Sequence, residues 1–176
     1  IGQGYNNFTP MQLAVATATV ANDGVAFKPH LVKNIVNLGT GEIRTVAPQP
    51  THTINSKPEH IAIIKNAFVG VNKEGTSATA FRNANYVSGG KTGTAQVYSL
   101  KGEKYVAHKI DERLRDHALF IAYAPADKPR IALSVLVENG GFGAQAAAPI
   151  ARKVLDYFLL GKTEPGPAPA VPVKEG

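Results

Sequence analysis

The spacing of apolar and polar positions predicts two helices in the first half of the chain. Residues 9–12, Thr-Pro-Met-Gln, place a hydroxyl at the N-cap, proline at the first helical position and glutamine at N3. A helix should begin there and run to about Asn22. Residues 56–59, Ser-Lys-Pro-Glu, spell a second capping box, and the apolar side chains after it recur at helical spacing: Ile61, Ile64, Phe68 and Val71. An amphipathic helix is therefore expected over 57–72, with its apolar stripe in the core.

Three apolar segments in the second half of the chain predict strands over 85–98, 117–124 and 130–138. Residues 125–129, Pro-Ala-Asp-Lys-Pro, form the turn between the last two. These last two segments are apolar on both faces, which is typical of strands in a sheet that helices cover on both sides. We therefore expect helices on each face of this sheet.

A peripheral hairpin is predicted earlier in the chain. Residues 28–37 and 42–47 are rich in β-forming side chains and flank Gly-Thr-Gly at 39–41. Pro48 and Pro50 should end this hairpin, because proline cannot donate to a strand ladder.

The C-terminal region predicts one more helix and a tail. Glycines at 140, 141 and 143 turn the chain into a helix expected over 145–160, which Gly161 ends. Its apolar positions should pack across the sheet: Ile150, Val154, Leu155 and Phe158. Residues 162–176 are rich in proline, alanine and glycine, which predicts a disordered tail.

Composition narrows the functional classes. The 176 residues carry a net charge of +6, but the most basic segment, 99–116, mixes lysine and arginine with aspartate and glutamate, so nucleic-acid binding is not expected. There is no cysteine, and the five histidines show no short metal-ligand spacing. We expect neither a metal nor a cofactor.

The strongest chemical signal is Lys91-Thr92-Gly93-Thr94 within the first of the three strands. Alternation along a strand puts Thr92 and Thr94 on one face, where their hydroxyls can donate to a carboxylate beside the positive charge of Lys91. Gly93 has no side chain, so a substrate backbone can lie close to the strand. A bare Lys-Thr-Gly triplet also fits an ordinary strand with a solvated lysine, and the flanking sequence separates the two interpretations.

That flanking sequence resembles a known family in order and spacing. The matching segments are Ile-Gly-Gln-Gly at 1–4, Thr-Pro-Met-Gln-Leu at 9–13, Ala-Asn-Asp-Gly at 21–24, Lys-Thr-Gly-Thr-Ala-Gln at 91–96, His-Lys at 108–109, Glu-Arg-Leu-Arg-Asp-His at 112–117 and Val-Glu-Asn-Gly-Gly at 137–141. Together they resemble the transpeptidase domain of class B penicillin-binding proteins. The 113–117 segment, with the long insert before it, is most similar to the elongation-type members that build the lateral wall. The resemblance implies an α+β fold with an antiparallel sheet flanked by helices.

The resemblance also implies a role for each signature residue. Thr92 and Thr94 would bind the terminal carboxylate of a peptidoglycan stem peptide, Lys91 would supply positive potential, and the Thr94 backbone N–H would form half of an oxyanion hole. A side chain at Gly93 would block the peptide. The expected activity is serine-type D,D-transpeptidation, which β-lactams inhibit by mimicking the D-alanyl-D-alanine end.

Two motifs of this family are missing from the chain. The nucleophile motif Ser-x-x-Lys and the second motif Ser-x-Asn should both lie upstream, and Ser88-Gly89-Gly90-Lys91 matches the first by spelling only, since an odd offset on a strand sends the two side chains to opposite faces. We therefore expect residues 1–161 to be the C-terminal part of a transpeptidase domain whose upstream part is one of its partners.

The remaining expectations follow from the family. The parent protein should lie at the periplasmic face of the inner membrane, anchored by a segment outside this chain, and should work with a membrane glycosyltransferase of the elongation machinery. Two alternatives stay open at this point: a serine β-lactamase or β-lactam sensor, and a non-catalytic peptidoglycan-binding module. The polar insert at 99–116 is expected to border the substrate groove and to be mobile without ligand.

Overall fold

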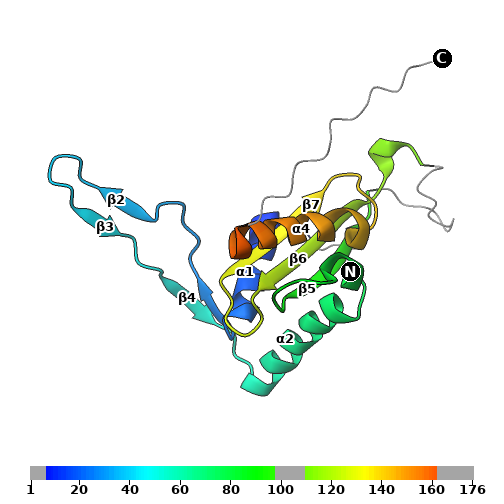
Figure 1. Cartoon of the computed structure of the whole chain (residues 1–176), viewed down its shortest axis with the longest axis horizontal. Helices are drawn as coiled ribbons and strands as arrows, with labels where there is room; N and C mark the ends of the chain where they lie inside the picture. The colour runs from blue at the N-terminus through cyan, green and yellow to red at the C-terminus, as the bar shows by residue number, and fades with distance from the viewer. Residues whose placement is uncertain (1–6, 98–109, 162–176) are drawn as a thin grey trace, which may run out of the picture.

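The computed structural model describes residues 7–97 and 110–161. Its central element is a three-stranded antiparallel sheet. Its strands are β5 (Gly89–Ala95), β6 (His117–Ala124) and β7 (Ile131–Val137), and β6 lies in the middle. Figure 1 shows β5 and β7 on either side of it. All three predicted strands are confirmed, although β5 is shorter than the 85–98 segment expected for it.

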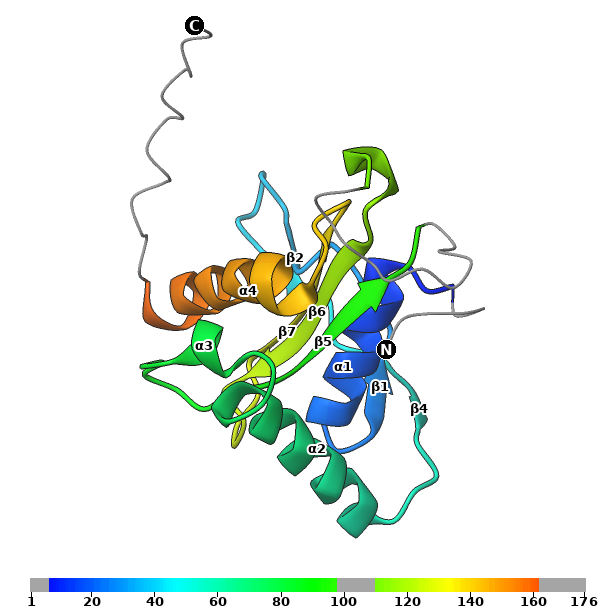
Figure 2. The ribbon, with the colours of Figure 1, turned by 90° about the vertical axis from the view of Figure 1, so that its right-hand side faces the viewer.

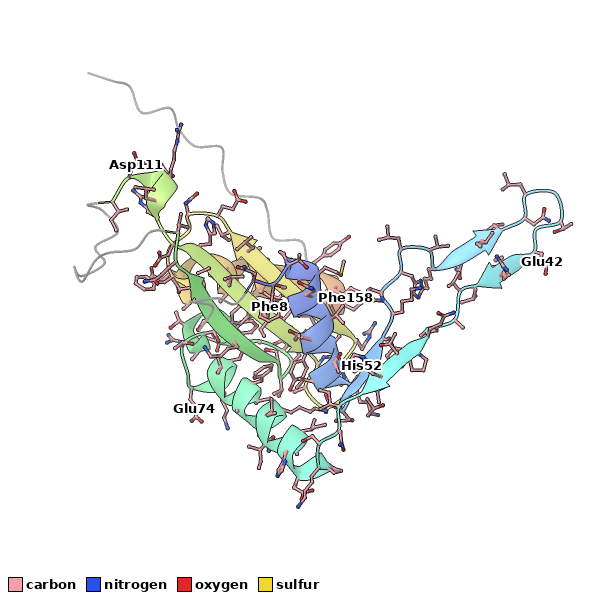
Figure 3. All side chains as sticks on the ribbon, turned by 180° about the vertical axis from the view of Figure 1, so that it is seen from behind. Phe8, Glu42, His52, Glu74, Asp111 and Phe158 are labelled. Carbon is pink, nitrogen blue, oxygen red and sulfur yellow. The ribbon has the colours of Figure 1, made fainter. Side chains whose placement is uncertain are left out.

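Helices cover both faces of this sheet, as its apolar strands predicted. Helix α4 (Gly143–Leu160) lies across the face turned to the viewer in Figure 1, and α1 (Pro10–Ala21) lies on the opposite face, which Figure 3 shows from behind. Helix α2 (Pro58–Lys73) packs against β5 and leads into the short helix α3 (Ala78–Phe81), as Figure 2 shows. The fold is therefore α+β, as expected.

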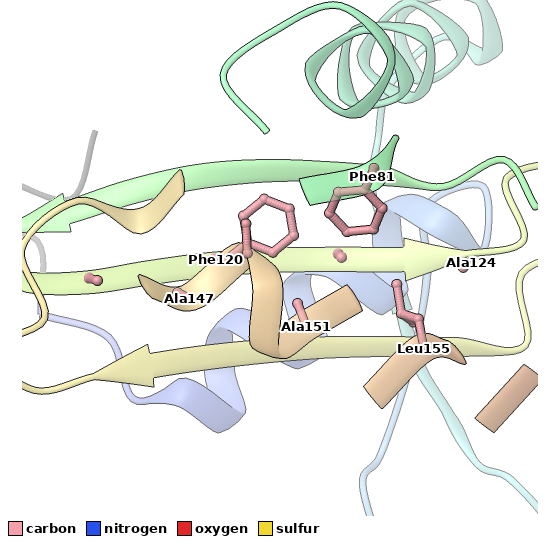
Figure 4. Packing of buried hydrophobic residues seen from close by; sticks show 9 residues of the cluster. Phe81, Phe120, Ala124, Ala147, Ala151 and Leu155 are labelled. Carbon is pink, nitrogen blue, oxygen red and sulfur yellow. The ribbon is translucent and has the colours of Figure 1, made fainter. Parts of the chain in front are cut away.

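The core lies between the sheet and α4 and is built largely from small side chains. Every second residue of β6 points into it, and Phe81 of α3 stacks on Phe120 at a centroid distance of 5.7 Å (Figure 4). The buried residues of this core are Phe81, Ala118, Phe120, Ala122, Ala124, Ala147, Ala148, Ala151 and Leu155. Alanines on both elements let the helix approach the sheet closely.

This packing corrects the predicted core face of α4. Leu155 is buried as expected, but Ile150, Val154 and Phe158 are 44%, 41% and 47% exposed. The sequence pattern favoured the large side chains, whereas the helix buries its alanine face because only small residues fit at this separation from β6. The three large apolar side chains lie on one flank of the helix, where each stays partly exposed.

The predicted hairpin is confirmed as β2 (Asn34–Val36) paired with β3 (Ile43–Thr45). It forms the outer part of an arm that projects from the body in Figure 1, with Glu42 near its tip in Figure 3. Leu31 and Leu38 on this arm are almost fully exposed.

The β2–β3 hairpin ends before Pro48, as predicted, because β3 stops at Thr45. A second pair of strands, β1 (Val25–Phe27) and β4 (Pro50–Thr53), continues the arm toward the body, and Pro50 is the first residue of β4. Proline is tolerated there because the first residue of a two-stranded ribbon need not donate to the ladder. The register shifts between Ala26 and Phe27, which is the residue that pairs with Pro50.

The helix ends agree with the sequence at one N-terminus and differ at the other. Thr9 caps α1 in a full capping box, with Gln12 N to Thr9 Oγ1 at 3.2 Å and Thr9 N to Gln12 Oε1 at 2.8 Å. The second predicted box is wrong: Lys57 is the N-cap of α2, and no side chain caps it. Because the helix starts at Pro58, the hydroxyl of Ser56 lies one residue too early to cap.

At the C-terminus, α4 ends at Gly161, whose positive φ of 64° gives the left-handed cap that the sequence predicted. The predicted tail at 162–176 lies outside the described residues. None of the described helices combines the length and hydropathy needed to cross a membrane.

Candidate active site

The signature residues Lys91, Thr92, Gly93 and Thr94 all lie on β5, at the edge of the sheet. Within the described part of the chain, β5 pairs only with β6. On its other edge Lys91 is exposed and residues 92–95 are partly exposed, so an extended ligand can pair with this part of the strand through backbone hydrogen bonds.

The register of β5 against β6 divides these residues between two faces. Thr92 pairs with Phe120 and Thr94 with Ala118, and both partners point into the core beneath α4. Because residues directly opposite in an antiparallel pair share a face, the two threonines lie on the α4 side, as their spacing predicted. Lys91 and Gly93 lie on the other face.

Lys91 is exposed, and its charge stays close to the strand. Its Nζ donates to the carbonyl oxygen of Thr92 at 2.7 Å. The ammonium therefore lies beside the backbone of Thr92, where it adds positive potential at the strand edge.

The start of α4 closes tightly over β5 at Gly93. A Cβ on Gly143 would lie 2.6 Å from the Gly93 carbonyl oxygen and would overlap the carbonyl oxygen of Leu119. Only glycine fits at the first residue of this helix. The helix thereby holds the backbone of β5 in place between the two threonines.

A contact that the sequence did not predict reaches Thr92 from the end of α2. The hydroxyl oxygens of Thr76 and Thr92 are 3.0 Å apart. The Gly75-Thr76-Ser77 segment follows the end of α2, and nothing in its sequence pattern showed that Thr76 reaches the signature strand. The sequence feature that could have indicated this contact is the pair of hydroxyl side chains, Thr76 and Ser77, directly after the end of α2.

Ser88 is only 4% exposed, and its Oγ accepts a hydrogen bond from Asn72 Nδ2 at 2.9 Å. Lys91, by contrast, is exposed. A buried hydroxyl that accepts its hydrogen bond from an amide is poorly suited to nucleophilic attack. This geometry supports the prediction that Ser88 is not the nucleophile.

Between β5 and β6 the structure describes residues 96–97 and 110–116, because residues 98–109 lie outside the described part. The end of this insert forms the 3-10 turn Glu112–Leu114, which the side chain of Asp111 caps. Since Ala95 pairs with His117, the insert leaves and re-enters the sheet at the C-terminal end of β5. Its place beside a substrate groove stays a prediction.

Two tyrosines near β5 have perturbed ionisation. Burial, reinforced by the hydrogen bond to Asp156, raises the pKa of Tyr86 well above its usual range. Burial also raises the pKa of Tyr123, which packs beneath Gly89.

Over residues 7–97 and 110–161, no three histidine, aspartate or glutamate side chains gather into a metal site.

Comparison with protein families matches residues 1–156 to the model described as penicillin binding protein transpeptidase domain. Among curated proteins, the peptidoglycan D,D-transpeptidase MrdA of Haemophilus influenzae is 42% identical over 90% of this chain, and that of Escherichia coli K12 is 38% identical over 99%. The chain spans only 25% and 28% of the length of these two relatives.

Solved structures agree with this match. The crystal structure of Pseudomonas aeruginosa PBP2 in complex with WCK 5153 aligns with a TM-score of 0.70 at 36% identity, covering 91% of this chain and 32% of the other. The imipenem acyl-enzyme complex of penicillin-binding protein A from M. tuberculosis aligns with a TM-score of 0.71 at 30% identity, covering 90% and 32%.

Proposed function

This chain belongs to the penicillin-binding protein transpeptidase family, and we propose that it supplies the Lys-Thr-Gly-Thr strand of a peptidoglycan D,D-transpeptidase that β-lactams inhibit. The observation that carries the proposal is the position of Lys91, Thr92, Gly93 and Thr94 on an open edge strand. Such an edge can bind the extended end of a stem peptide.

The proposed reaction passes through a serine acyl-enzyme. A serine in the parent protein, outside this chain, attacks the carbonyl of the penultimate D-alanine and releases the terminal D-alanine. The amine of a neighbouring stem peptide then resolves the acyl-enzyme and forms the cross-link. A β-lactam enters the first step and stays attached.

Residues of this chain would bind the donor peptide and stabilise the transition state. The hydroxyls of Thr92 and Thr94 share a face of β5 and would hold the terminal carboxylate, with Lys91 supplying positive charge beside them. The backbone N–H of Thr94 would donate to the developing oxyanion. A donor of this kind typically contributes about 3 kcal/mol to lowering the barrier.

We propose that the parent protein cross-links the lateral wall during elongation, at the periplasmic face of the inner membrane, together with a membrane glycosyltransferase. The relatives reported above are named as transpeptidases or penicillin-binding proteins, which favours this function over a β-lactamase or a non-catalytic binding module.

The test is the rate of acylation by labelled penicillin in the parent protein. Lys91→Ala should slow acylation at least about tenfold, because a well-placed charge at a carboxylate contributes more than about 1.4 kcal/mol. Lys128→Ala, in the exposed turn between β6 and β7, is the matched control and should react like the parent. Unchanged acylation in a folded Lys91→Ala variant would remove Lys91 from the site.

A further inference from the structure

We propose that Thr76 is a positioning residue for the carboxylate site: its hydroxyl donates to Thr92 and thereby directs the Thr92 hydrogen toward the ligand. The proposal rests on the proposed function, which assigns Thr92 to carboxylate binding. Its geometric basis is the 3.0 Å separation of the two hydroxyl oxygens.

The direction of this hydrogen bond follows from the chemistry of a hydroxyl. Each threonine has one hydrogen to donate and lone pairs to accept with. If Thr92 donated to Thr76, it would have no hydrogen left for a carboxylate. When Thr76 donates to Thr92, the Thr92 hydrogen is free, and the relay from Thr76 through Thr92 to the anion polarises both bonds.

The turn that carries Thr76 is held tightly against the end of α2. Ser77 N donates to the carbonyl oxygen of Val71 at 3.3 Å, and Ser77 Oγ lies 3.0 Å from the same oxygen. Gly75 N donates to the carbonyl oxygen of Gly70 at 2.9 Å, and a Cβ on Gly75 would lie 2.8 Å from the Val71 Cα. Because only glycine permits this close return, the position of Thr76 is fixed by the backbone on both sides.

Asn72 joins the same turn to the start of the signature strand. Its Oδ1 accepts from Ser77 Oγ at 2.6 Å, and its Nδ2 donates to Ser88 Oγ at 2.9 Å. All three side chains are 5% exposed or less. A Cβ on Gly90 would lie 2.8 Å from Asn72 Oδ1, so the backbone of β5 passes directly over this amide.

This buried network fixes the distance between Thr76 and Thr92. One end of it anchors the turn and the other end anchors β5, and both threonines lie on the adjacent surface, on the α4 side of the strand. A fully satisfied polar network in low dielectric is rigid, because breaking any member leaves a buried group without a partner. Thr76 is therefore presented to Thr92 in one geometry.

The experiment compares Thr76→Val, Thr76→Ser, Thr92→Val and the Thr76→Val/Thr92→Val double variant in the parent protein. The readout is the second-order rate of acylation by labelled penicillin and by its carboxylate methyl ester. Thr76→Val should slow penicillin about three- to tenfold, as expected for one hydrogen bond, and Thr76→Ser should restore the rate to within about twofold. Thr79→Val, an exposed threonine of α3, is the matched control and should not change either rate.

Two further results separate positioning from a merely structural effect. Thr76→Val should add almost nothing in the Thr92→Val background, because Thr76 acts through Thr92. It should also leave the rate with the methyl ester unchanged, since the ester has no anion to hold. The proposal would be overturned if the double variant were slowed by the product of the two single factors. It would also be overturned if Thr76→Val slowed the reactions with penicillin and with the ester equally.

The outcomes also distinguish this inference from the proposed function. Impaired Thr92→Val together with a normal Thr76→Val would refute positioning by Thr76 and leave the carboxylate site intact. Normal acylation in Thr92→Val would refute the assignment of Thr92 to the carboxylate, and the positioning role would fail with it.

Discussion

The backbone N–H of Asn139 donates to Nδ1 of His117 at 2.9 Å, joining the turn after β7 to the first residue of β6. The side chain of Asn139 continues this link, since its Nδ2 donates to the carbonyl oxygens of Arg113 and Arg115, each at 3.0 Å. Asn139 also has a positive φ of 55°. One residue thus fastens the end of the insert to the sheet.

Replacing this residue should loosen the end of the insert. Asn139→Ala removes two hydrogen bonds and places an alanine in the left-handed region, so the free energy of unfolding of the parent protein should fall by about 2 to 3 kcal/mol. Asn139→Gly loses the same bonds without the backbone strain, so its free energy of unfolding should fall by about 1 kcal/mol less than that of the alanine variant. Urea unfolding checks both values, and a glycine variant less stable than the alanine variant would contradict this account.

Close packing of α4 on β5 leads to a second prediction. Gly143→Ala should lower the stability of the parent protein by at least about 2 kcal/mol and slow acylation by penicillin, because the added methyl group displaces the backbone at Gly93. Gly70→Ala is the control: it lies within α2 with only the Glu74 side chain at 4.0 Å, and it should stabilise the helix. Equal behaviour of the two variants would show that α4 does not hold β5.

The pKa of Tyr86 predicts a specific loss of stability at alkaline pH. The Tyr86 hydroxyl donates to Asp156 Oδ1 at 2.8 Å, and Arg152 Nε donates to both oxygens of the same carboxylate at 2.9 Å. Because the pKa of Tyr86 is raised in the folded state, its stabilising contribution is complete below the unfolded pKa of about 10 and is lost as pH rises above it.

Tyr86→Phe isolates this effect. The stability advantage of the parent protein over the variant should shrink by up to about 1.4 kcal/mol per pH unit above pH 10, because the unfolded tyrosine ionises while the folded one keeps its proton. Urea midpoints of both proteins from pH 8 to 11 measure the difference. Parallel pH profiles would show that Tyr86 is not held protonated.

The sequence predicted the parts of the fold that depend on local patterns. The capping box at Thr9 and the left-handed glycine at Gly161 are set by neighbouring residues, and both were confirmed. The buried face of α4 was not predictable in this way. The helix buries Ala151 and leaves Ile150 partly exposed because it lies close to β6. That distance cannot be predicted from the residue pattern of the helix alone.

In the candidate site, too, local features were predictable and long-range contacts were not. The shared face of Thr92 and Thr94 follows from the period of a strand, so the sequence predicted it. The Thr76 contact depends on how the exit of α2 folds back against Val71, and this return brings together residues 16 positions apart. Long-range contacts of this kind require the assembled structure.

The most direct test of the central claim is a crystal structure of the parent protein acylated by a penicillin. We expect the carboxylate of the adduct within about 2.6 to 3.0 Å of both Thr92 Oγ1 and Thr94 Oγ1, with Lys91 nearby and the Thr94 N–H directed at the adduct carbonyl oxygen. An adduct whose carboxylate binds elsewhere, with β5 making no contact to it, would contradict the assignment of Lys91, Thr92 and Thr94 to the active site.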